Sequence, residues 1–265
     1  MESLSFDNLT EYYDETRDYD IASFNEAINY IANRYPIAKY PALFEPGIGS
    51  GRIAIPLAEK GYKVTGIDIS NQMIEILKEK ISNQSSLDIK CQVADTTDIP
   101  FLPDSFDISV VVHLFYFIKH WEKAADEIVR VVKGPIVVLH TGMGQEVPFL
   151  NQKYKDICRD LNSPIINVGV NSTNEVFDYL KRTNCDIENV ENNWKWKSKV
   201  NLSKAYAYIK NRAYSFTHLV AEETHIKAVS ILLEYLESNY AEMHNTEIEV
   251  NNSISLSIIT KRKKC

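Results

Sequence analysis

Residues 42–52 predict a strand, a tight turn and the start of a helix within one short segment. An apolar run ends in Glu45, glycines follow at alternate positions, and a helical pattern of apolar residues begins at Ile53. Glycine has no Cβ and adopts positive φ readily, so the backbone of Gly47, Gly49 and Gly51 can lie directly against a ligand. The N–H groups that open the next helix would face the same ligand. The segment therefore predicts a ligand-binding turn at the end of a buried strand. The alternative is a glycine turn that joins strand to helix without a ligand.

The spacing of the glycines indicates which ligand the turn would take. A dinucleotide-binding turn has the pattern G-x-G-x-x-G, whereas this chain has G-x-G-x-G with an acid two residues ahead. A second predicted strand, residues 62–67, leads to Asp68. An acidic side chain at this place accepts the hydroxyl protons of a ribose. The two strands together indicate a nucleoside-containing ligand.

These residues resemble motif I of the class I S-adenosylmethionine-dependent methyltransferases, in the small-molecule branch of methyltransferase type 11 and the ubiquinone and menaquinone biosynthesis enzymes. The resemblance follows the motif order over about residues 6–140. It implies an α/β, Rossmann-like, doubly wound seven-stranded sheet, with six parallel strands and an antiparallel seventh, a helical N-terminal cap and a helical lid insertion. It also implies an enzyme that uses S-adenosyl-L-methionine and releases S-adenosyl-L-homocysteine.

The resemblance implies a set of cofactor-binding residues. The glycine turn would lie under the methionine part, Asp68 would hold the ribose, and Ile69 and Met73 would line the adenine pocket. Asp95, with Thr96 beside it, would bond the adenine amino group. Core packing is the alternative for Met73, and a turn aspartate is the alternative for Asp95. A surface tyrosine with an ion-paired arginine is the alternative for Tyr13 and Arg17 in the N-terminal cap. The full set is Tyr13, Arg17, Glu45, Gly47, Gly49, Gly51, Arg52, Asp68, Ile69, Met73, Asp95, Thr96 and His113.

Two histidines follow predicted strands that end at the cofactor edge, His113 after strand four and His140 after strand five. Transfer of a methyl group from a sulfonium is an in-line displacement that mainly requires positioning and needs no metal. A nucleophile that carries a proton would also benefit from a general base, and histidine suits that role near neutral pH. His113 is the candidate catalytic base. The alternatives are a hydrogen bond to the backbone or contact with the methionine group.

The substrate side is less defined by the sequence. The candidate substrate contacts are Tyr12, Tyr116, His140, Trp194, Arg212 and Tyr214. Tyr206 and Tyr208 are also aromatic, but their helical spacing favours core packing. After strand four the chain has His113-Leu114-Phe115-Tyr116, where relatives that methylate amide nitrogens have Asn/Asp-Pro-Pro-Tyr/Phe. That difference argues against a nucleic-acid substrate.

Helical and strand patterns predict how the chain is divided. We expect one methyltransferase domain over residues 1–265: an N-terminal cap (1–40), a cofactor-binding half (41–142), substrate-side helices and a lid around strand six (143–250), and a last strand with a basic tail (251–265). Strand six is predicted within residues 187–197, two amphipathic helices within 202–240, and strand seven at 253–260.

Composition limits the classes of partner. With a net charge of -7, the chain is not expected to bind nucleic acid through a broad basic face. Its four cysteines are scattered without metal-ligand spacing, so reduced thiols and no metal site are expected. No signal peptide or membrane-spanning run is visible, and we expect a cytoplasmic monomer or homodimer that acts on a small molecule.

The sequence leaves several functions open. The leading prediction is methyl transfer to an O, N or C atom of a small organic molecule. The alternatives are other uses of the same cofactor (cyclisation or aminocarboxypropyl transfer), methylation of RNA or protein, and a non-catalytic regulatory protein that binds the cofactor. Fold alone does not choose among them.

Overall fold

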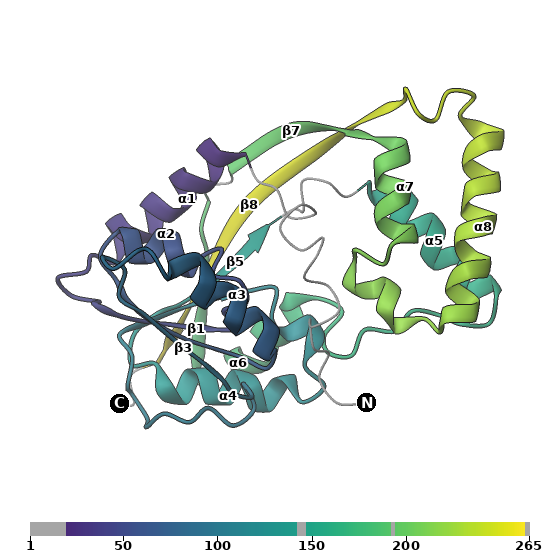
Figure 1. Ribbon diagram of the computed structural model, residues 1–265. Helices are drawn as coiled ribbons and strands as arrows, with labels where there is room; N and C mark the ends of the chain where they lie inside the picture. Colours follow the sequence, from purple (N-terminus) through teal and green to yellow (C-terminus); the bar gives the residue numbers. More distant parts are fainter. Residues whose placement is uncertain (1–19, 142–146, 192–193, 263–265) are drawn as a thin grey trace.

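The computed structural model describes residues 20–141, 147–191 and 194–262, which form a mixed α/β structure (Figure 1). The strands are β1 (Ala42–Pro46), β2 (Lys63–Asp68), β3 (Ile89–Val93), β4 (Ile108–Val112), β5 (Ile136–Thr141), β6 (Cys185–Asn189), β7 (Trp194–Asn201) and β8 (Glu247–Lys261). The α-helices are α1 (Ile21–Arg34), α2 (Ala54–Glu59), α3 (Asn71–Ile81), α4 (Trp121–Val131), α5 (Pro148–Asp160), α6 (Thr173–Arg182), α7 (Leu202–Lys210) and α8 (Glu222–Asn239). Two 3-10 helices, η3 (Phe115–Phe117) and η4 (Ser215–Leu219), complete the described elements.

The sheet has the order β3-β2-β1-β4-β5-β8-β6, and β7 also pairs with β8. Neighbours from β3 to β5 are parallel, whereas β8 runs antiparallel to β5, β6 and β7. The predicted doubly wound α/β fold with one reversed strand is therefore confirmed. The predicted number of seven strands was wrong, because the described residues form an eight-stranded sheet.

The additional strand arises within the segment that the sequence analysis treated as strand six. Residues 187–197 were predicted as one strand, but they contain the end of β6 and the start of β7. Both strands pair with β8, which is longer than the strand predicted at 253–260. Strand β6 pairs with the second half of β8, and β7 pairs with the first half. The alternation of apolar and polar residues is similar in the two strands, so periodicity alone did not separate them.

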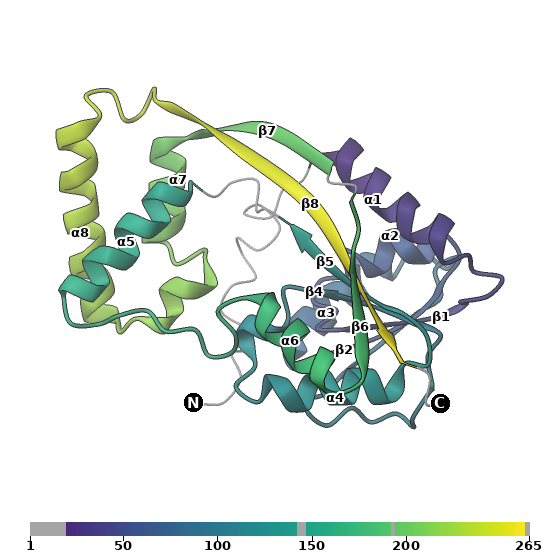
Figure 2. The ribbon, with the colours of Figure 1, turned by 180° about the vertical axis from the view of Figure 1, so that it is seen from behind.

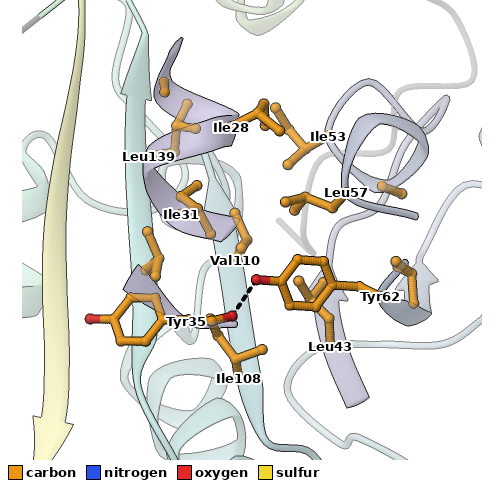
Figure 3. Close-up of a cluster of buried hydrophobic side chains, with 14 of the residues drawn as sticks. Ile28, Ile31, Tyr35, Leu43, Ile53, Leu57, Tyr62, Ile108, Val110 and Leu139 are labelled. Carbon is orange, nitrogen blue, oxygen red and sulfur yellow. Dashed lines mark hydrogen bonds between the residues drawn. The ribbon is translucent and has the colours of Figure 1, made fainter. Parts of the chain in front are cut away.

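Helices cover both faces of the sheet and bury its two apolar surfaces. On one face α1, α2 and α3 pack on alternate residues of the central strands. Figure 3 shows side chains of α1 and α2 beside Leu43, Ile108 and Val110 of these strands. There the Tyr62 hydroxyl donates a hydrogen bond to the backbone carbonyl of Tyr35. On the other face α4 and α6 cover the intervening positions of the same strands. Burial on both faces explains why these strands read as continuous apolar runs.

Helices α5, α7 and α8 form a separate group at the far end of the two-stranded ribbon of β7 and β8 (Figures 1 and 2). They have an apolar core of their own, centred on buried residues such as Leu150, Tyr154, Ile209 and Leu232. The two helices predicted within residues 202–240 correspond to α7 and α8. No helix in the described part of the chain is both long enough and apolar enough to cross a membrane. The predicted segment boundaries at residues 40, 142 and 250 stay predictions.

Candidate functional site

A cavity of about 510 Å³ lies between the glycine turn and the helices α5 and η4. Its walls come from the turn after β1, the ends of β2 and β4, the residues after β3, η3, α5, the loop before α6, and η4. The volume is typical of a site for a small organic molecule. The cavity is at the carboxyl ends of the parallel strands, where doubly wound sheets bind ligands.

The glycine turn has the backbone conformation that its sequence predicts. Gly47, Gly49 and Gly51 have φ values of 70°, 53° and 82°, in the region that favours glycine. The N–H groups of Gly47 and Ile48 donate to the carbonyl of Ile67, at 2.8 and 2.9 Å, which joins the turn to β2. Gly47 and Gly49 line the cavity together with Arg52.

Gly51 has a different position from the other two glycines. It is absent from the cavity lining, and a Cβ at this residue would lie 2.4 Å from Cδ1 of Leu77 in α3. This glycine therefore permits close packing of the turn against α3. The sequence analysis placed it against the cofactor, and its position indicates an indirect part in shaping the site.

Asp68 connects the end of β2 to the glycine turn. Its carboxylate accepts hydrogen bonds from the N–H of Gly49 at 2.8 Å and from the N–H of Ser70 at 2.9 Å. The side chain also lines the cavity. Asp68 is thus held rigidly at the place where the sequence analysis expects a ribose.

Glu45 is a buried carboxyl group at the cavity wall, with 3% of the residue exposed. Its Oε2 atom has no hydrogen-bond partner among the described residues. Burial, followed by the negative charge of Asp68, raises the pKa of Glu45 well above its ordinary value, against the opposing effects of the Ala54 N–H and Arg52. An unpartnered buried acid suits a ligand that carries a positive or hydrogen-bond-donating group, such as the amino group of S-adenosylmethionine.

The predicted adenine residues all line the cavity: Ile69, Met73, Asp95 and Thr96. Ile69 is 42% exposed, a large fraction for an isoleucine, while Met73 is buried. The Asp95 carboxylate accepts the N–H of Thr97 at 2.8 Å, as a turn aspartate does. The two interpretations offered for Asp95 are compatible, because its turn lies at the cavity wall.

His113 lines the cavity at the end of β4, and its φ of 48° is unusual for a residue with a Cβ. Its Nε2 atom lies 2.6 Å from Oγ1 of Thr141 at the end of β5. This hydrogen bond fixes the ring orientation. The sequence analysis did not identify Thr141, which no motif marks.

The predicted substrate residues are only partly brought together. Tyr116 lines the cavity, and its hydroxyl lies 2.9 Å from that of Thr173. The other described candidates do not line it. Trp194 packs edge-on against Tyr30 of α1, with 5.7 Å between ring centroids. His140 lies beside Phe177, and burial lowers its pKa.

Arg212 and Tyr214 lie behind the wall instead of in it. The Arg212 guanidinium donates to the carbonyls of Thr217 and Val220 and forms a 2.8 Å ion pair with Glu222, which holds η4 in place. The Tyr214 ring stacks on Phe216, which does line the cavity. Tyr12, Tyr13 and Arg17 lie outside the described residues.

The sequence analysis missed one wall of the cavity. Pro148, Asn151, Gln152 and Lys155 line it from one face of α5. Their spacing of three, four and seven residues marks one side of a helix, but all except Pro148 are polar, so an apolar pattern did not reveal them. Asn167, Asn171, Ser215 and Phe216 complete this wall. Among the described residues, no group of three His, Cys, Asp or Glu side chains is arranged to hold a metal ion.

A family described as "Methyltransferase domain" matches residues 44–135, which contain the glycine turn, Asp68 and His113. A demethylmenaquinone methyltransferase from Clavibacter sepedonicus is 25% identical over 184 residues, which cover 68% of this chain and 74% of that protein. The chain spans less than half the length of two further curated relatives that it matches.

Solved structures share the fold. The YcgJ protein from Bacillus subtilis has a TM-score of 0.60 at 16% identity, over 90% of this chain and 99% of that one. Phosphoethanolamine N-methyltransferase 2 from Haemonchus contortus, solved in complex with S-adenosylhomocysteine, has a TM-score of 0.51 at 18% identity, over 90% of this chain and 53% of that one. The match over residues 44–135 agrees with the motif order of the sequence, and this part of the chain is similar to a methyltransferase domain.

Proposed function

We propose that this chain transfers the methyl group of S-adenosylmethionine to an O, N or C atom of a small organic molecule. The observation that carries the proposal is that one cavity joins two different walls. The wall at the strand ends contains most of the residues predicted to bind the cofactor, and the wall of α5 and η4 faces it with none of them. Such an arrangement suits an enzyme that holds two molecules side by side.

The strand-end residues fit the chemical groups of the cofactor. Glu45 offers an unpartnered carboxyl oxygen for the amino group, and the fixed carboxylate of Asp68 suits the ribose hydroxyls. Ile69 and Met73 give apolar contacts for the adenine ring, and Asp95 suits its exocyclic amino group. When bound, the cofactor supplies a methyl group on a sulfonium that is already activated toward displacement.

His113 is the residue that we assign to proton transfer. Its imidazole lines the cavity and is oriented by Thr141, so it can accept a proton from an oxygen or nitrogen nucleophile. A carbon or already deprotonated nucleophile does not require this step. In either case the wall of α5 and η4 positions the nucleophile and excludes water.

Mass spectrometry of reaction products tests this proposal. The protein is incubated with S-adenosylmethionine and pools of small metabolites, and the formation of S-adenosylhomocysteine is followed with the mass of each acceptor. We expect S-adenosylhomocysteine together with an acceptor that gains one methyl group in place of a hydrogen. A product that is rearranged without mass change, or that gains an aminocarboxypropyl group, would contradict methyl transfer.

The prediction of a small-molecule substrate agrees with the cavity volume of about 510 Å³ and with the net charge of -7, which disfavours a long polyanion. The cytoplasmic location and the state of monomer or homodimer stay predictions.

A further inference from the structure

We infer that the substrate of this enzyme carries an anionic group, a carboxylate or a phosphate, that binds Lys155 and Asn151 on α5. The inference rests on the proposed function and adds a chemical class for the substrate. It is drawn from the distribution of charge and of unpartnered polar groups across the cavity.

The charges that line the cavity differ between its two walls. The acidic side chains among the lining residues are Glu45 and Asp68, at the ends of β1 and β2, and Asp95, just after β3, and Arg52 lies on the same wall. Lys155 is the charged side chain that lines the opposite wall, where its described neighbours are amides, a hydroxyl and apolar groups. A substrate group bound beside α5 is therefore next to a positive charge, and the acids lie on the other wall.

Lys155 is not neutralised by an acid in the described structure. Its Nζ atom lies 4.9 Å from the centre of the Phe216 ring, and no carboxylate of the described residues forms an ion pair with it. The neighbouring acid on the helix, Asp156, pairs instead with Arg159 at 2.8 Å. The ammonium group is thus available to an anion at the cavity surface.

Asn151 gives a second and independent indication of a ligand. The residue is 7% exposed, it lines the cavity, and its side-chain amide has no partner among the described residues. The amide atoms remain accessible from the cavity, so a bound polar group can replace water as their partner. Asn151 is in the first turn of α5, where the helix dipole is positive and also favours an anion.

The apolar part of the cavity lining defines the rest of the substrate. Leu114, Phe117 and Phe216 line the same cavity with apolar side chains. A substrate with an anionic group on a flat or apolar body fits both the charge of Lys155 and the apolar lining. Its methyl-accepting atom lies toward His113. Carboxylates and phosphates share this chemistry, and matched probes separate them.

Binding of matched probes to the S-adenosylhomocysteine-loaded protein tests the inference. The probes are 4-hydroxybenzoate against 4-hydroxybenzamide, and phenyl phosphate against phenol, titrated by ligand-observed NMR. We expect at least one anion to bind about tenfold or more tightly than its neutral counterpart, because hydrogen bonds to charged groups are the stronger ones. Lys155→Met should abolish this preference, and Lys155→Arg should retain most of it.

Lys153→Met is the matched control, because Lys153 is on the same helix but packs over the Tyr235 ring and does not line the cavity. It should keep the preference for anions. Three results would overturn the inference. Charged and neutral probes could bind equally, no probe could bind, or Lys155→Met could lose as much affinity for S-adenosylhomocysteine as for the anion. Failure of wild-type protein to bind S-adenosylhomocysteine would instead contradict the proposed function, so the two failures are distinct.

Discussion

Glu45 shows how a ligand-binding residue affects the protein before any ligand binds. A carboxyl group surrounded by apolar atoms and near another acid keeps its proton in the folded protein. Natural sites often hold such destabilising groups where a ligand later supplies the missing partner. Replacing Glu45 should therefore change both the free energy of unfolding and the affinity for the ligand. The pH dependence of unfolding without ligand reports the first effect alone.

Replacing Glu45 should change the pH dependence of stability. Burial raises the folded-state pKa of Glu45 above its ordinary value of 4.5, so the folded form holds a proton that the unfolded chain releases as pH rises. Its contribution to stability is fully present below the unfolded pKa and is lost as pH rises toward the folded pKa. In Glu45→Gln this loss should disappear from urea unfolding measured from pH 4.5 to 8. Glu59→Gln, a change at an exposed residue of α2, should behave as wild type. A Glu45→Gln curve parallel to wild type would contradict the assignment.

Asp68 should contribute strongly to cofactor affinity. Asp68→Ala leaves the ribose hydroxyls and the Gly49 N–H without their acceptor, and we expect a loss of about 1–3 kcal/mol of binding free energy. Isothermal titration with S-adenosylhomocysteine measures this directly. Asp88→Ala removes the same charge from an exposed residue just before β3 and serves as the control. Equal affinities of Asp68→Ala and wild type would exclude the ribose role.

His113 is tested best with asparagine, because asparagine tolerates the positive φ at this position better than alanine. If His113 accepts a proton from the nucleophile, His113→Asn should lower the rate of methyl transfer and remove the fall in rate toward acidic pH. Affinity for S-adenosylhomocysteine, measured by titration, should stay within a few fold of wild type. A variant with unchanged single-turnover rate at every pH would show that His113 is not the base.

At the scale of elements, Arg212 links α7 to η4 and thereby shapes the substrate wall. Arg212→Ala removes hydrogen bonds to two carbonyls and an ion pair, and the Arg212 side chain is only 18% exposed. We expect a loss of about 1–3 kcal/mol in the free energy of unfolding by urea. Arg159→Ala, which breaks an ion pair with a 62% exposed arginine side chain, should change it by less than about 0.5 kcal/mol. Similar losses in the two variants would contradict a structural role for Arg212.

The elements also show which features sequence reasoning could reach. The glycine turn, Asp68 and the ends of the buried strands depend on local patterns, such as positive φ and runs of apolar residues, and these were predicted from the sequence. The pairing of β7 with β8 joins residues 46 to 60 positions apart, and no local pattern encodes it. The polar face of α5 faces a cavity, so its residues resemble an ordinary exposed helix surface.

In the molecule as a whole, the two walls of the cavity come from two separate parts of the fold. The sheet provides the strand ends that the family motif marks, while α5, α7 and α8 form a separate core that brings the second wall to the cavity. The wall at the strand ends was predictable because binding of the ligand itself requires the spacing of the glycines and of the acids. The second wall depends on a substrate that the motif does not specify, which explains why Trp194, Arg212 and Tyr214, predicted as substrate contacts, are absent from the cavity lining.

Calorimetric titration of the wild-type protein with S-adenosylhomocysteine, and then with S-adenosylmethionine, measures whether the chain binds the cofactor. We expect one site per chain for each compound, with weaker binding in Asp68→Ala and unchanged binding in Asp88→Ala. Absence of binding heat for both compounds, at several temperatures so that a zero enthalpy is not mistaken for no binding, would contradict this expectation.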